Sequence, residues 1–141
     1  MLRQFSISVA IALIAGAVNA EDWLVIPTNS ANVEFSIDTA SIQHEGSRVK
    51  FSERLVYRKP EQKDALSGKF IKEKLVYRVM DCGKQTQGVL RGSLRAVDGR
   101  IIESISVDEA KVGMTPVPPG TLAAKELEIV CEPAVKGTPT P

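Results

Sequence analysis

Few side chains in this sequence could perform chemistry. Two cysteines, Cys82 and Cys131, and one histidine, His44, carry the only thiol and imidazole groups in the 141 residues. His44 precedes Glu45 and Gly46 in a segment typical of an exposed turn, where we expect a solvated imidazole. The nucleophile motif Gly-x-Ser-x-Gly and the glycine-rich phosphate loop are both absent. We therefore expect a protein that is not an enzyme and that holds neither a cofactor nor a metal.

The two cysteines have a structural interpretation. The chain carries the signals of an exported protein, and exported compartments are oxidising, so a disulfide between Cys82 and Cys131 is the first interpretation. The bridge would close a loop of about 50 residues and stabilise the fold by about 4 kcal/mol on the chain-entropy account. The alternative is a pair of inert buried thiols. A metal site is disfavoured because the chain has one histidine and no Cys-x-x-Cys pair.

Basic side chains supply a candidate binding site. They come from two expected strands and, if these strands are neighbours, would form a basic surface on one sheet face: Arg54, Arg58, Lys72, Lys74 and Arg78. In a nearly neutral protein this local concentration of charge could bind an acidic extracellular polymer or protein. The alternative is an ordinary solvated face that nearby acids balance.

The first twenty residues have the pattern of a signal peptide. Arg3 gives a positive start, residues 7–17 form an apolar run, and Val18-Asn19-Ala20 places small residues at the cleavage positions. The run is too short to span a bilayer, which needs about 20 apolar residues. We expect cleavage before Glu21, and the alternative is a buried N-terminal helix. Since no cysteine follows the cleavage point, we expect a soluble exported protein without a lipid anchor.

Composition and charge exclude several classes of protein. Hydrophobic residues make up 43% of the chain and charged residues 25%, as in an ordinary soluble domain, and the length suits one domain. Lys and Arg total 18 against 17 for Asp and Glu, a net charge of +1. Removal of Arg3 with the signal peptide makes the mature chain formally neutral. This balance argues against a protein that holds nucleic acid mainly by neutralising phosphates.

The elements that position these residues are mostly strands, because apolar residues recur with period two. The alternation predicts strands near residues 23–26, 33–37, 49–58, 70–80, 90–96 and 101–107. The sequence Glu-Arg-Leu-Val-Tyr-Arg at 53–58 is echoed by Glu-Lys-Leu-Val-Tyr-Arg at 73–78. The echo favours pairing these two strands, with the Leu and Tyr positions of both directed toward one core.

Two further signals shape the C-terminal half. Asp98-Gly99 predicts a tight hairpin turn that pairs Leu94 with Glu103 and Ala96 with Ile101. Beyond a proline-rich connector, the spacing of apolar residues predicts a short helix over 122–130, which Thr121 caps. Cys131 lies on the apolar side of this helix. We expect residues 132–141 to be a disordered tail, which leaves 21–131 as the folded domain.

Several of these features occur together in a recognisable order. Asp22-Trp23-Leu24-Val25, Phe35-Ser36-Ile37-Asp38, Asp81-Cys82, the segment Pro116-Val117-Pro118-Pro119-Gly120-Thr121 and a final Val130-Cys131 follow one another. The combination resembles the surface-adhesin protein E family of Gram-negative bacteria over about residues 22–131. The resemblance implies an α+β fold: a single curved antiparallel sheet of about six strands, with a short C-terminal helix tied by the Cys82–Cys131 bridge. It also implies a cell-envelope location, periplasmic or outer.

The resemblance gives the most specific expectation of function. Its namesake is similar to proteins that bind host matrix and serum components such as vitronectin and laminin. We therefore expect an exported, non-enzymatic envelope protein that binds a host extracellular-matrix or serum protein, or another envelope component. The alternative is a periplasmic carrier that encloses a small apolar ligand. An enzyme is a third, weaker interpretation. None of these interpretations involves nucleic acid as a partner or a transmembrane segment.

Overall fold

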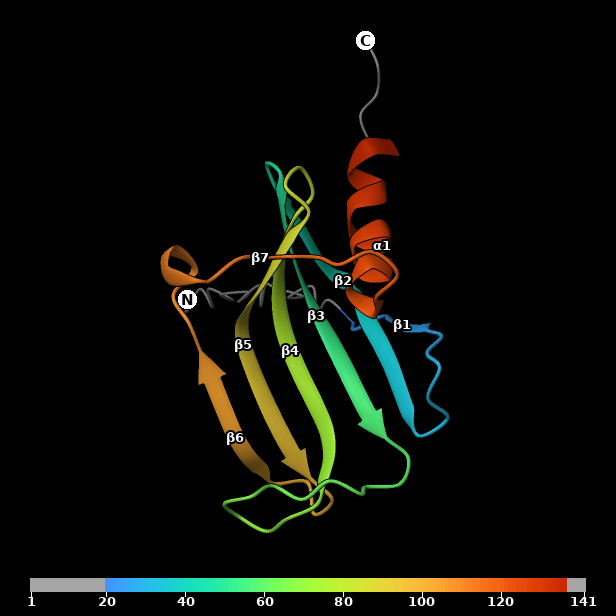
Figure 1. The fold of residues 1–141 in the computed structure, drawn as a ribbon, viewed down its shortest axis with the longest axis vertical. Coiled ribbons are helices and arrows are strands. Elements are labelled where there is room, and N and C mark those ends of the chain that lie inside the picture. Colours follow the sequence, from blue (N-terminus) through green and yellow to red (C-terminus); the bar gives the residue numbers. More distant parts are fainter. Residues whose placement is uncertain (1–19, 137–141) are drawn as a thin grey trace, which may run out of the picture.

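The fold is one antiparallel sheet with a helix against one of its faces (Figure 1). The computed structural model describes the backbone of residues 20–136 and the side chains of residues 20–132. The expected signal peptide, Ala20 excepted, and the last five residues of the expected tail lie outside the described residues. The elements are β1 (Trp23–Ile26), β2 (Val33–Glu45), β3 (Arg48–Tyr57), β4 (Ile71–Asp81), β5 (Thr86–Ala96), β6 (Ile101–Ser106), the 3-10 turn η1 (Glu109–Lys111), β7 (Thr115–Pro116) and α1 (Leu122–Lys136).

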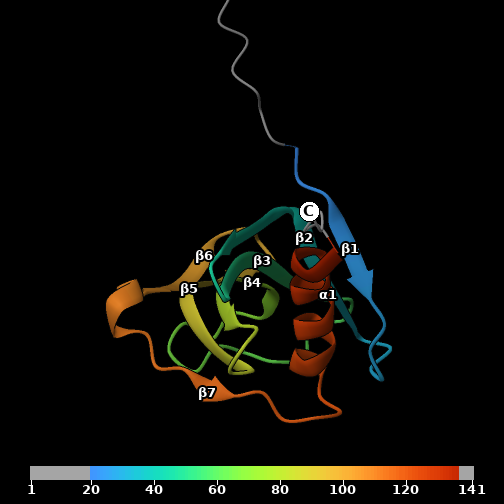
Figure 2. The same cartoon turned by 90° about the horizontal axis from the view of Figure 1, so that it is seen from above.

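The strand order confirms the predicted α+β fold. Strands β1 to β6 lie in sequence order across the sheet, each antiparallel to the next, and β7 pairs with the end of β5 that β6 does not cover. Seen from above, the sheet curls and α1 stands near β2 (Figure 2). The sheet stays open because its first and last strands do not pair with each other.

The apolar core lies between the sheet and α1. Side chains that alternate along β2 and β3 point toward the helix, as period two requires. With Val130 of the helix they form one buried cluster: Ile26, Phe35, Ile37, Val49, Phe51, Met80 and Val130. Helix α1 packs mainly against β2 and β3. The faces of the sheet are therefore unequal, and we call the covered one the helix face and the other the open face.

The ends of α1 agree only in part with the sequence. Thr121 caps the helix as predicted, because its Oγ1 accepts a hydrogen bond from the Ala124 amide at 3.2 Å. The Cys82–Cys131 disulfide is present and fastens the helix to the end of β4. The helix continues to Lys136, beyond the predicted end at Val130.

The pairing of β3 with β4 corrects one prediction from the sequence echo. The two segments do lie on neighbouring strands, but the register places Leu55 opposite Lys74 and Arg54 opposite Leu75. Residues opposite each other share a face, so Leu55 and Leu75 lie on opposite faces of the sheet. The expectation that the Leu and Tyr positions of both strands face one core is wrong. The two segments are alike in sequence. The antiparallel register nevertheless turns equivalent positions of the second segment to the opposite face of the sheet.

The hairpin between β5 and β6 follows its predicted register except next to the turn. Leu94 pairs with Glu103 as expected, whereas Ile101 pairs with Arg95 instead of Ala96 because the ladder shifts there. Gly99 adopts a φ of 85° in the turn, a conformation that favours glycine. The predicted apolar side of β6 is not covered, and the side chains of Ile101 and Ile105 are more than half exposed.

Gly88 allows the connector after β6 to approach the open face. A Cβ atom at this position would lie 2.8 Å from Val112 Cγ2 and 3.0 Å from the Gly113 carbonyl oxygen. The sequence suggests such a close approach or a bend, because a strand interior rarely uses glycine. The connector then crosses β5 as β7 and leads to α1 (Figure 1). Glycine at 88 thus places the connector, and with it the start of the helix.

The close approach at Gly88 gives a stability prediction. We expect Gly88→Ala to destabilise the protein by about 1–3 kcal/mol, because the added methyl group must displace the connector backbone. Gly113→Ala is the matched control, since no atom lies within 4 Å of the place that its added Cβ would take. Urea unfolding of both variants measures the difference. Equal stability of the two variants would contradict the packing described here.

The disulfide gives a second stability prediction. Replacing both Cys82 and Cys131 with serine is expected to lower the free energy of unfolding by about 4 kcal/mol. Without the bridge, the unfolded chain gains the conformational entropy of a long loop that is no longer closed. Urea unfolding of the double variant against the oxidised wild type measures this change. A loss below about 0.5 kcal/mol would show that sheet packing alone holds α1 in place.

Candidate binding surface

The five basic residues predicted as one surface do not share a face. Arg54 lies opposite Leu75 on the open face, whereas Arg78 lies opposite Phe51 and Lys74 opposite Leu55 on the helix face. The prediction of a single basic surface is wrong for the same reason as the Leu and Tyr prediction. The register between β3 and β4 pairs even-numbered residues of one strand with odd-numbered residues of the other.

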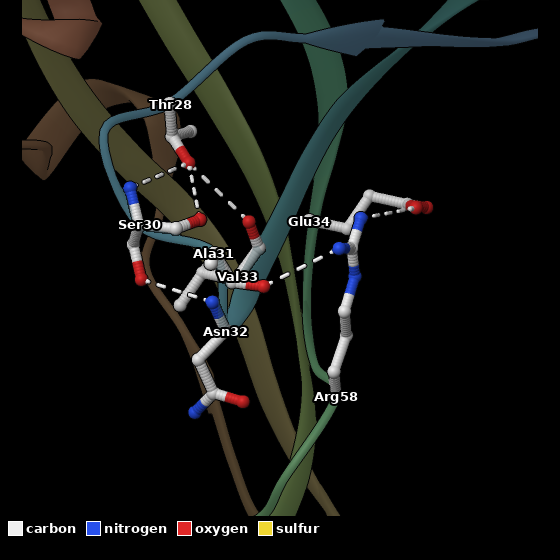
Figure 3. Close-up of polar contacts among 7 residues, drawn as sticks. All are labelled: Thr28, Ser30, Ala31, Asn32, Val33, Glu34 and Arg58. Carbon is white, nitrogen blue, oxygen red and sulfur yellow. Dashed lines mark hydrogen bonds and ion pairs between the residues drawn. The ribbon is translucent and has the colours of Figure 1, made fainter.

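Three of these cations have structural contacts. The guanidinium of Arg58 donates to the Ala31 carbonyl at 3.3 Å and lies 3.8 Å from the Glu34 carboxylate, which connects it to the loop before β2 (Figure 3). Thr28 orders the same loop, since its hydroxyl donates to the Val33 carbonyl at 3.3 Å. Two lysines gather around Tyr57: Lys72 donates to its carbonyl at 2.7 Å, and Lys74 lies over its ring at 5.8 Å.

Arg78 lies on the helix face, where it is largely buried and forms an ion pair with Glu53. Its Nη2 and Nε donate to the two Glu53 carboxylate oxygens at 2.6 and 2.9 Å, and its Nη1 donates to Gln87 at 2.7 Å. Burial lowers the pKa of Arg78, but the hydrogen bonds and the charge of Glu53 raise it by more. Arg78 is therefore a structural cation that is held away from any external ligand.

Glu126 of α1 completes this buried cluster. Its side chain is 2% exposed, and burial, followed by the hydrogen bond and the charge of nearby Glu53, raises the pKa of Glu126 to about 10. The carboxyl group is therefore neutral at physiological pH. Sequence reasoning missed both acids, although alternation places Glu53 on the buried face with Phe51, and helical spacing places Glu126 between Ala123 and Val130.

The open face contains a hollow with a volume of about 790 Å³. Residues from β1 through β6 line it, so it crosses the whole sheet. Its lining combines polar and aromatic side chains with aliphatic ones, and the carboxylates of Glu21 and Asp38 are among its charged groups. The lining residues include Trp23, Asp38, Ser41, Ser52, Leu75, Tyr77, Arg91, Ser93, Ser104 and Ser106.

Register explains why these side chains meet. One row across the sheet pairs Asp38 with Ser52, Ser52 with Tyr77, and Tyr77 with Arg91. Ser106 ends this row on β6. The next row toward the other end of the strands runs through Ser36, Arg54, Leu75, Ser93 and Ser104. The residues of these two adjacent rows line the hollow, except for Ser36 and Arg54.

Arginine lies over an aromatic ring at two places on the open face. The Arg54 guanidinium carbon is 4.3 Å from the centre of the Trp23 ring, and that of Arg91 is 4.5 Å from the centre of the Tyr77 ring. Neither arginine forms an ion pair within the described part of the chain. The Nε of Arg54 is buried without a hydrogen-bond partner. Both cations are thus positioned by rings and keep their charge for another partner.

Asp38 shapes one end of the hollow by local hydrogen bonds. Its Oδ1 accepts from the amides of Asp22 at 2.8 Å and Ala40 at 3.1 Å, and its carbonyl accepts from the Ser41 hydroxyl at 2.6 Å. Ser41 in turn accepts from the Ser52 amide at 2.8 Å, within the register shift that interrupts the β2–β3 ladder. Asp38 and Ser41 fix the backbone of this irregular stretch.

This arrangement defines a class of protein: a small domain with a single sheet, one face of which is covered and the other open. A disulfide fastens its C-terminal helix to the sheet. The chain belongs to the surface-adhesin protein E family, which it matches over residues 23–132. This establishes the family that the sequence resembles. A comparison with curated proteins found no match.

Solved structures confirm the fold. One structure of Haemophilus influenzae protein E is 14% identical, with a TM-score of 0.53 over 84% of this chain and 98% of that one. A second, crystal form II of the same protein, is 15% identical, with a TM-score of 0.52 over 74% of this chain and 83% of that one. At this level of identity, the likeness extends to the fold alone. In the described residues, no helix is long and apolar enough to cross a membrane.

Glu126 gives a prediction of pH dependence. Its pKa is higher in the folded protein than in the unfolded chain, so the folded state binds the extra proton and stability falls as pH rises from about 4.5 toward about 10. The Glu126→Gln variant keeps the shape without the titration. We expect it to remove up to about 1.4 kcal/mol per pH unit of this loss, measured by urea unfolding between pH 5 and 9.

Glu128→Gln is the matched control for this experiment, because Glu128 is exposed on the same helix. The control is expected to follow the wild-type pH profile. If the Glu126→Gln variant also follows that profile, Glu126 is charged in the folded protein and the description of the buried cluster is wrong.

Proposed function

We propose that this protein is an exported surface adhesin that acts by binding, without catalysis, through the open face of its sheet. The observation that carries the proposal is the match to the surface-adhesin protein E family across residues 23–132. The partner we propose is a host extracellular-matrix or serum protein, or another component of the cell envelope. Neither nucleic acid nor a cofactor has a part in this proposal.

The two faces of the sheet support the choice of surface. On the helix face, α1 covers the core and Arg78 is paired with Glu53, so its charge is not available. On the open face, Arg91 lines the hollow and Arg54 lies over the ring of its lining residue Trp23. Neither arginine has an ion-pair partner in the described residues. A partner with negative charge would therefore dock on the open face, where complementary charge raises the association rate.

The proposed location rests on two features. Residues 1–20 have the pattern of a cleaved signal peptide, and the Cys82–Cys131 bridge suits an oxidising compartment. We propose that the cleaved protein is in the periplasm or at the outer envelope. Adhesion requires the outer location, so location is the cheapest discriminator.

The carrier alternative receives less support. A carrier of a small apolar ligand would enclose an apolar cavity. The large hollow of the described chain is open to solvent, and serine, arginine and aromatic side chains line it. This lining suits a polar partner better than an apolar one.

Surface display gives the test. Intact cells of a Gram-negative host that express the full chain should lose the protein on brief protease treatment, and should adhere to laminin-coated or vitronectin-coated wells more than cells with an empty vector. A periplasmic enzyme that stays intact in the same cells controls for leakage. Recovery of the whole protein from the soluble periplasm, protected from protease, would contradict adhesion.

A further inference from the structure

The open-face hollow has a lining whose chemistry indicates a ligand class. We propose that it binds an acidic oligosaccharide, a short polymer of carboxylate-bearing sugars. This inference rests on the proposed binding function and names the chemistry that the open face recognises. The volume of about 790 Å³ falls within the range of small-molecule sites, about 300–1,000 Å³.

Serine hydroxyls contribute much of the polar lining of the hollow. Five serines line it, and they come from β2, β3, β5 and β6. Strand positions usually favour β-branched and aromatic residues, so folding alone does not call for this many small polar side chains on one face. The hydroxyls of Ser93, Ser104 and Ser106 have no protein partner in the described residues. Each can donate and accept a hydrogen bond, as the hydroxyl groups of a sugar require.

The two open-face arginines supply the preference for acidic groups. Arg54 and Arg91 come from β3 and β5, two strands apart, so their backbones are separated by about 10 Å across the sheet. The planar guanidinium group binds a carboxylate through two parallel hydrogen bonds. Arg91 inside the hollow and Arg54 over the ring of its lining residue Trp23 suit a ligand whose negative charge repeats along its length.

Aromatic rings distinguish a sugar polymer from an acidic peptide. Trp23 and Tyr77 line the hollow beside the arginines that stack on them. Aromatic rings combine an apolar body with a polar tip, which suits a ligand that carries both C–H surfaces and hydroxyls. An acidic peptide would also use the arginines, but it offers far fewer hydroxyl groups to pair with the serine rows. The combination therefore favours a saccharide over a peptide of the same charge.

Calorimetry with defined oligomers tests the proposal on the purified mature protein. We expect tetragalacturonate to bind with an affinity that falls as salt is added, and both a neutral tetrasaccharide and tetraglutamate to bind at least tenfold more weakly. The Arg91→Gln variant should weaken tetragalacturonate binding at least tenfold. Lys74→Gln is the matched control, since it also removes a cation over a tyrosine ring but on the helix face. It should bind like the wild type.

A second variant blocks the hollow without changing charge. Ser104→Trp places a large side chain at the exposed β6 end of the hollow and should also weaken binding at least tenfold. Circular dichroism confirms that each variant is folded. The proposal is overturned if the wild type binds no tetragalacturonate, if tetraglutamate binds as tightly, or if Arg91→Gln or Ser104→Trp, when folded, binds as tightly as Lys74→Gln.

The saccharide inference and the proposed adhesion fail in different experiments. Calorimetry on purified protein needs no surface display, and the shaving and adhesion assay needs no saccharide. Cells that adhere to coated wells while the purified protein ignores tetragalacturonate would retain the adhesin proposal and remove the saccharide. Binding of tetragalacturonate by a protein confined to the periplasm would do the reverse.

Discussion

The antiparallel register between β3 and β4 is the constraint on which the rest of the structure depends. Because Arg54 lies opposite Leu75 and Phe51 lies opposite Arg78, one set of side chains meets α1 and the other set meets solvent. A slip of one residue in β4 against β3 would exchange the two faces of β4, turning Tyr77 toward α1 and Arg78 toward solvent. The core, the buried ion pair and the open-face hollow all follow from this one choice of register.

The helix face combines apolar packing with a buried polar cluster. Phe51, Met80 and Val130 supply the apolar contacts, while Arg78, Glu53 and Glu126 bring charge and a neutral carboxyl under the helix. Buried ion pairs contribute little net stability, but removal of one partner typically costs about 3–5 kcal/mol. The disulfide then limits how far α1 can separate from the sheet. The helix face thus holds the apolar cluster, the ion pair and the helix that the disulfide fastens.

The sequence predicts the fold better than it predicts the site. Period-two alternation, the Asp98-Gly99 turn and the Thr121 cap each depend on residues close in the chain, and the structure confirms them. The basic surface depended on how distant strands align, and local patterns carry no information on that register. Glu126 also shows that local patterns do not reveal contacts between distant elements. Its helical spacing among apolar residues was visible, but its buried neighbour Glu53 comes from another element.

The register can be measured directly through side-chain nuclear Overhauser contacts in solution. Protons of the Tyr77 ring should show contacts with the side chains of Arg91 and Ser52, and none with α1. Contacts from the Tyr77 ring to Leu127 on the apolar side of α1 would contradict this result. They would place the Leu and Tyr positions of β4 on the helix face, and the division into a covered and an open binding face would be wrong.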